Sequence, residues 1–141
     1  DNHIVVFDIS LSDSVTVRKV NVLTGHIDIV SDIAVSMNRL FSSSYDSTIR
    51  VWDISMLDPT STVCVKSLTG HTDKINSIVI NRGLLYSGSG DCSIRIWDIF
   101  TSSSKDIKCI HVLKGHSSSV NSLVVNGKWL YSGSSDKTIR I

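Results

Sequence analysis

Three sets of histidine, serine and aspartate recur along the chain, and each set has the residue types of a catalytic triad. They repeat every 45 residues, as His26, Ser42 and Asp46, as His71, Ser87 and Asp91, and as His116, Ser132 and Asp136. In a hydrolase these residue types supply a nucleophile, a general base and a carboxylate that orients the base. Catalysis needs one such constellation in a cleft, whereas this one recurs in every repeat. We therefore expect structural hydrogen-bond networks and no catalytic residue.

Three further motifs keep the same period. A Gly-His pair stands at residues 25–26, 70–71 and 115–116, and a Trp-Asp pair at 52–53 and 97–98. Phe7-Asp8 lies one period before the first Trp-Asp pair. Each repeat also contains an Asp, one variable residue, a Ser or Thr, and Ile-Arg, at 46–50, 91–95 and 136–140. The chain is therefore a repeat protein.

This combination resembles the WD-repeat family, in which a Gly-His pair and a Trp-Asp pair recur with a period of about 40–45 residues. The resemblance covers essentially the whole chain. It implies an all-β fold, a β-propeller whose blades are four-stranded antiparallel sheets.

The resemblance also implies roles for the recurring polar residues. In the family, the Asp of a tight turn accepts a hydrogen bond from the Gly-His histidine. The other histidine nitrogen faces a strand serine, and that serine faces the Trp indole. Here Trp52 and Trp97 would complete two such networks. Ser44 is an alternative to Ser42 in the first network, and we prefer Ser42.

Alternating apolar and β-branched residues predict the strands. In the first complete blade they lie at 30–35, 40–44, 48–52 and 63–68, and the next two blades follow the same plan. Asn126-Gly127 is a strong hairpin signal, because both residues tolerate positive φ. We expect no helix longer than a turn.

The repeats predict a single propeller domain over residues 1–141 that is incomplete. Its repeat anchors lie at 25–53, 70–98 and 115–141, with the end of a preceding repeat at 1–8. A propeller needs about four blades to close. We therefore expect a piece of a longer protein, with the remaining blades supplied by the rest of the chain or by another copy, and we favour the first.

Composition excludes several classes of function. A net charge of +1 with 19% charged residues gives no electrostatic case for nucleic-acid binding, which calls for a clustered basic face, although local basic patches are compatible with it. The chain has no run of about 18 apolar residues that could span a membrane. No Cys/His cluster has the spacing of zinc ligands, so we expect no metal and no cofactor. Three cysteines, an odd number, are expected to be reduced thiols in an intracellular compartment, cytoplasm or nucleus.

The family resemblance implies a protein or peptide partner on the narrow top rim, which is formed by the loop before each first strand and by the Asp turn. The rim positions are Ile29, Ser31 and Tyr45 on the first complete blade, Lys74, Asn76 and Gly90 on the second, and Ser119, Asn121 and Ser135 on the third. Aromatic residues such as Tyr45 are enriched among interface hot spots.

The predicted function is a non-enzymatic protein–protein interaction scaffold, the propeller module of a larger protein. Two alternatives are the substrate-receptor module of a ubiquitin ligase and a targeting domain attached to a kinase, which flanking domains would distinguish. A hydrolase is a third, which a serine-reactive probe would detect.

Overall fold

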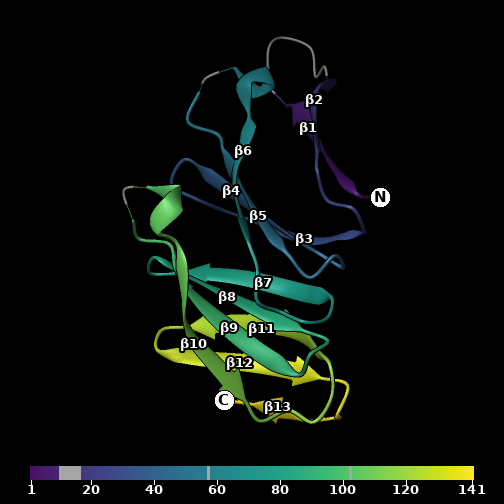
Figure 1. Ribbon diagram of the computed structural model, residues 1–141, viewed down its shortest axis with the longest axis vertical. Helices are drawn as coiled ribbons and strands as arrows, with labels where there is room; N and C mark the ends of the chain where they lie inside the picture. Colours follow the sequence, from purple (N-terminus) through teal and green to yellow (C-terminus); the bar gives the residue numbers. More distant parts are fainter. Residues whose placement is uncertain (10–16, 57, 102) are drawn as a thin grey trace.

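The computed structural model describes residues 1–9, 17–56, 58–101 and 103–141, which form four antiparallel sheets (Figure 1). The first sheet pairs β1 (His3–Asp8) with β2 (Arg18–Thr24). Two four-stranded blades follow. Their strands are β3 (Val30–Ser36), β4 (Arg39–Ser44), β5 (Ile49–Asp53) and β6 (Val63–Leu68), then β7 (Ile75–Asn81), β8 (Leu84–Ser89), β9 (Ser93–Asp98) and β10 (Lys108–Lys114). The fourth sheet contains β11 (Val120–Asn126), β12 (Trp129–Ser134) and β13 (Ile139–Arg140).

The strands agree closely with those predicted from the sequence. In the blade β3–β6 each observed boundary lies within one residue of the predicted one. Helical structure in the described residues is limited to two three-residue 3₁₀ turns, η1 (Pro59–Ser61) and η2 (Ser104–Asp106). The prediction of an all-β fold built from four-stranded antiparallel blades is confirmed for β3–β6 and β7–β10.

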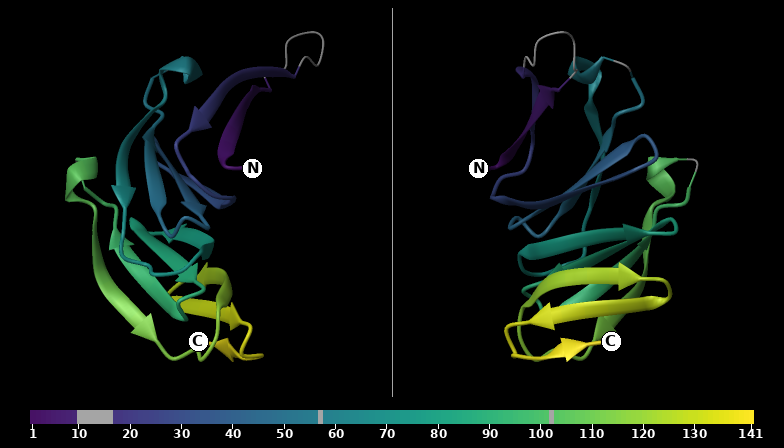
Figure 2. Two further views of the ribbon diagram at one scale, coloured as in Figure 1. Left: turned by 45° about the vertical axis from the view of Figure 1, so that its right-hand side comes forward. Right: turned by 180° about the vertical axis from the view of Figure 1, so that it is seen from behind.

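The sheets follow one another in chain order along the long axis of the molecule. Figure 1 shows β1–β2 at one end and β11–β13 at the other, and the rear view in Figure 2 shows the same succession. The first strands of successive sheets, β3, β7 and β11, contact one another. This is the arrangement of neighbouring propeller blades in an incomplete ring.

Apolar side chains fill the space between successive sheets. Phe41, Ile49 and Val51 from one blade share a buried cluster with Ile75 and Leu85 from the next, and all five are at most 1% exposed. A second cluster joins Leu23 of β2 to Leu40 and Trp52 of the following blade. Each blade therefore buries its two faces against its two neighbours, which is how repeat proteins are stabilised.

The glycine of each Gly-His pair permits close contact between blades. A Cβ atom on Gly25 would lie 2.5 Å from Nη1 of Arg50, and one on Gly70 would lie 2.7 Å from Nη1 of Arg95. The φ angles of these glycines are +152° and +143°, a region that other residues rarely adopt. The periodic arginines therefore pack against the Gly-His loops.

Burial between the blades predicts unequal effects for two valines. Val51 is fully buried, whereas Val35 on β3 is 60% exposed. We expect Val51→Ala to lower the free energy of unfolding by about 2 kcal/mol and Val35→Ala to change it by less than about 0.5 kcal/mol. Chemical denaturation of both variants measures the difference, and similar losses would contradict the assigned core.

Candidate functional site

The first recurring polar set forms a continuous chain of hydrogen bonds. His26 Nδ1 lies 2.8 Å from Asp46 Oδ2, and His26 Nε2 lies 2.8 Å from Ser42 Oγ. The indole Nε1 of Trp52 donates to the same Ser42 Oγ at 2.9 Å. The chain of bonds thus links the loop after β2, the strands β4 and β5, and the turn between those strands.

The other two sets have the same geometry. His71 lies 2.7 Å from Asp91 and 2.8 Å from Ser87, and Trp97 donates to Ser87 at 3.0 Å. His116 lies 2.7 Å from Asp136 and 2.9 Å from Ser132. In the described part of the chain no indole reaches Ser132, and a hollow of about 360 Å³ adjoins it.

The direction of the protons follows from which atoms can donate. An ionised carboxylate only accepts, so the proton of His71 resides on Nδ1, and Nε2 accepts from the Ser87 hydroxyl. That hydroxyl in turn accepts from the Trp97 indole. Ser42 and Ser87 are fully buried and Ser132 is 4% exposed. The arrangement is that of a triad, but burial closes Ser42 and Ser87 to a substrate.

The serine two residues after each network serine makes different hydrogen bonds. Ser44 Oγ donates to the carbonyl of Asp28 at 3.2 Å and accepts the amide of Asp46 at 3.0 Å. Ser89 makes the equivalent bonds to Asp73 and Asp91. Ser42 contacts the histidine, and Ser44 fastens the turn to the loop.

The aspartate of each turn is the centre of several hydrogen bonds. Asp46 Oδ1 accepts the amide of Thr48 at 2.9 Å and its hydroxyl at 2.6 Å, while Oδ2 also accepts the amide of Ile27 at 3.2 Å. Ser47, which lies between Asp46 and Thr48 in the turn, has a φ of +67°. The carboxylate therefore holds a strained turn and the Gly-His loop together.

These bonds set the protonation of the network. Burial by itself would raise the pKa of Asp91, but hydrogen bonds from Ser93 and His71 outweigh it and lower that pKa to about 2. Burial lowers the pKa of His71, and the neighbouring Asp91 only partly opposes this. At neutral pH the network therefore contains an ionised aspartate and a neutral histidine.

Three of the predicted rim residues donate side-chain hydrogen bonds within or between sheets. Ser31 Oγ donates to the carbonyl of Ile75 at 2.6 Å, and Asn76 Nδ2 donates to the carbonyl of Val120 at 2.9 Å, so each reaches the next sheet. Asn121 Nδ2 donates to Ser135 Oγ at 2.8 Å. The polar groups of these side chains are thus engaged in holding the scaffold.

The remaining rim positions differ in size and exposure. Ile29 is 46% and Tyr45 is 37% exposed, and the ammonium of Lys74 lies 5.2 Å from the centroid of the Tyr45 ring. The counterparts of Tyr45 on the other blades are the small residues Gly90 and Ser135, and those of Ile29 are Lys74 and Ser119. Ile27, which follows the Gly-His pair and is 85% exposed, is a further rim residue that the sequence pattern did not predict. Its position directly after a buried histidine is the signal that could have identified it.

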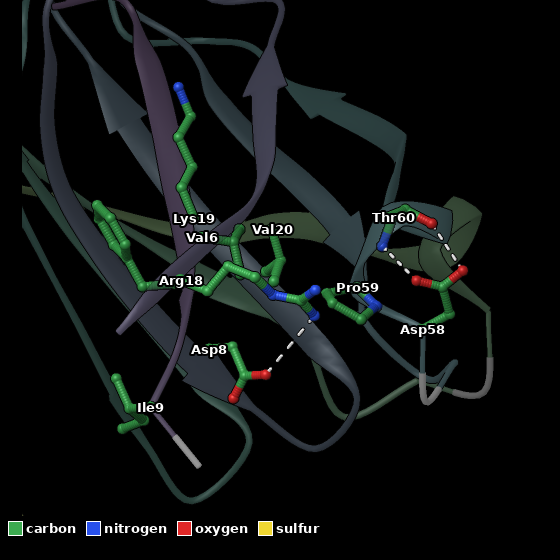
Figure 3. Close-up of a pocket in the computed structure, with 10 residues that line it drawn as sticks. Val6, Asp8, Ile9, Arg18, Lys19, Val20, Asp58, Pro59 and Thr60 are labelled. Atoms are coloured by element: carbon green, nitrogen blue, oxygen red, sulfur yellow. Dashed lines mark hydrogen bonds and ion pairs between the residues drawn. The ribbon is translucent and has the colours of Figure 1, made fainter. Parts of the chain in front are cut away.

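A hollow of about 780 Å³ lies beside the β1–β2 sheet, at the end of the blades opposite the rim (Figure 3). Arg18 points toward Asp8, with 4.0 Å between Nη2 and Oδ2, and Asp58 accepts two hydrogen bonds from Thr60. None of the predicted site residues lines this hollow.

The described residues contain no group of three or more His, Cys, Asp or Glu side chains placed to hold a metal ion. None of their helical segments is long and apolar enough to cross a membrane.

Comparison with known proteins identifies the repeats. The family model described as "WD domain, G-beta repeat" matches the chain at 17–53, 62–98 and 107–141, which is more than half of its length. A comparison with curated proteins gives no match.

Removing a network histidine should destabilise its blade. We expect His71→Ala to lower the free energy of unfolding by about 1–3 kcal/mol, because Ser87 and Asp91 lose a buried partner. His111 is exposed, and His111→Ala provides the control. Thermal and chemical unfolding compare the two variants, and an undiminished stability of His71→Ala would contradict the network.

The network also predicts that stability falls on acidification. The pKa of folded His71 lies below the unfolded value of about 6.5, so its contribution is complete above that pH and is lost as the pH falls toward the folded pKa. The contribution of Asp91 is complete above the unfolded value of about 3.9 and is lost as the pH falls toward 2.

Denaturation curves measured across this pH range test both steps. His71→Gln should lose most of the upper step, whereas His111→Gln should retain it. An upper step of equal size in both variants would show that another group causes it.

Proposed function

Because this chain belongs to the WD-repeat family, we propose that it is a non-enzymatic scaffold for protein–protein interaction, acting as the propeller module of a larger protein. Domains of this family generally bind protein partners and are generally not catalytic. Residues 1–141 would be part of one propeller domain. Its remaining blades would come from the rest of the chain or from another copy.

We place the partner on the top rim, where the Gly-His loops and the Asp turns meet. The observation that carries this proposal is that, in each loop, the backbone amide of the residue after the Gly-His pair is hydrogen-bonded to the turn aspartate while its side chain is exposed. The Ile27 amide donates to Asp46 while the Ile27 side chain is 85% exposed, and the amides of Thr72 and Ser117 make equivalent bonds. Backbone and buried side chains hold the rim, so its exposed side chains are available to a partner.

The alternatives differ in what accompanies the propeller. A ubiquitin-ligase substrate receptor would carry an F-box or RING segment elsewhere in its chain, and a kinase targeting domain would accompany a nucleotide-binding domain. No feature of the described residues favours either over a general scaffold. All three functions, the scaffold and its two alternatives, would involve recognition of a protein on the rim.

Substitutions confined to one end of the blades test this proposal. The rim variant changes one exposed loop residue per blade: Ile27→Arg, Thr72→Glu and Ser117→Arg. The control changes one exposed residue per blade at the opposite end with the same change in net charge: Met37→Arg, Arg82→Gln and Asn126→Arg. We expect proteins that copurify with the unmodified protein from its own cells to be retained by the control and lost by the rim variant, as quantified by mass spectrometry. Retention by the rim variant would place the partner elsewhere.

A further inference from the structure

One boundary between blades carries a group of large side chains on the rim. We define the rim patch as Ile27, Ile29, Tyr45 and Lys74. The first three belong to the blade β3–β6 and its preceding loop, and they are 85%, 46% and 37% exposed. The amide of Tyr45 donates to the carbonyl of Ile29 at 2.9 Å, so these two residues adjoin. These three large side chains are therefore open to solvent.

The fourth member of the rim patch comes from the next blade. The ammonium of Lys74 lies 5.2 Å from the centroid of the Tyr45 ring. It forms no ion pair with any carboxylate of the described residues. The adjacent carboxylate of Asp73 accepts a hydrogen bond from the Lys74 amide at 2.7 Å, and it lies close to Gly90, as does the stem of the Lys74 side chain. The ammonium of Lys74 therefore lies over the face of an aromatic ring and has no paired carboxylate among the described residues.

The scaffold does not require these large side chains. Gly90 and Ser135 occupy the position of Tyr45 on the other blades, and their amides make the same turn bond, at 2.8 and 2.9 Å. Ser119 likewise stands where the first complete blade has Ile29. Since a turn closes equally well with glycine or serine, the exposed isoleucines and the tyrosine need another explanation. Aromatic anchors beside apolar contacts are typical of interface hot spots.

We propose that the rim patch binds a segment of a partner protein that carries a bulky apolar side chain close to a carboxylate. The apolar side chain packs on Ile29 and Tyr45, and the carboxylate pairs with Lys74, whose ammonium is a compact point charge. Charge complementarity selects an acidic segment, because a basic side chain placed over Lys74 would be repelled. This inference rests on the proposed rim function and names the chemistry of its partner.

An array of short peptides tests the inference. Each peptide has a Gly/Ser frame with one Leu and either Glu or Lys at varied spacing, and a third group has Glu without Leu. We expect the Leu/Glu peptides to bind best to the protein. Lys74→Met should weaken their binding about tenfold, and Tyr45→Ser should weaken it at least as much. Serine is tolerated at the equivalent position of another blade, so Tyr45→Ser should remain folded.

A matched control exists at the opposite end of the blades. The ammonium of Lys128 lies 5.1 Å from the centroid of the Trp129 ring, so Lys128→Met removes a similar cation–π contact away from the rim. That variant should bind the Leu/Glu peptides as the unmodified protein does. Equal effects of Lys74→Met and Lys128→Met would overturn the inference.

The remaining outcomes separate this inference from the proposed function. Preference for Leu/Lys peptides, insensitivity to Tyr45→Ser, or no binding by any peptide would overturn the acidic and apolar partner. After any of these results, the copurification experiment with the rim variant and its control still tests whether the rim binds a partner protein. If copurified proteins are retained by the rim variant, the proposed function fails whichever peptides bind.

Discussion

The structure depends on one constraint, that a buried polar group is tolerable only when it is paired. Each histidine of a Gly-His pair is at most 9% exposed and bonds at both ring nitrogens. Its partners come from a strand and from a turn, so the full set of bonds can form in one register only. Burying the histidine thus fixes the loop, the turn and the strand relative to one another.

The same network connects neighbouring blades, because the Gly-His loop follows the last strand of one sheet and its histidine forms hydrogen bonds with the next sheet. Gly25 lies directly after β2, yet His26 bonds to Ser42 and Asp46 of the blade β3–β6. The arginine of β5 then packs on Gly25, where a Cβ atom would not fit. Intra-blade hydrogen bonding and inter-blade packing therefore support each other.

Sequence predicted the features that depend on local pattern. The third strand of the blade β3–β6 begins at Ile49, one residue after the predicted Thr48. The choice between Ser42 and Ser44 stayed open because residues two apart share one face of a strand. The bonds from Ser31 and Asn76 to the next sheet, and the contact of Lys74 with Tyr45, could not be predicted, since they depend on how blades are placed.

The contact between Lys74 and Tyr45 couples ligand binding to the packing of the blades. Tyr45 and Lys74 belong to different blades, so their side chains meet only when those blades are packed in register. A ligand that contacts both binds the packed arrangement better than a separated one, and by linkage it stabilises the boundary between the blades. Recognition at the rim and cohesion of the propeller are then coupled, and the coupling passes through the interface that Ser31 and Asn76 already hold together.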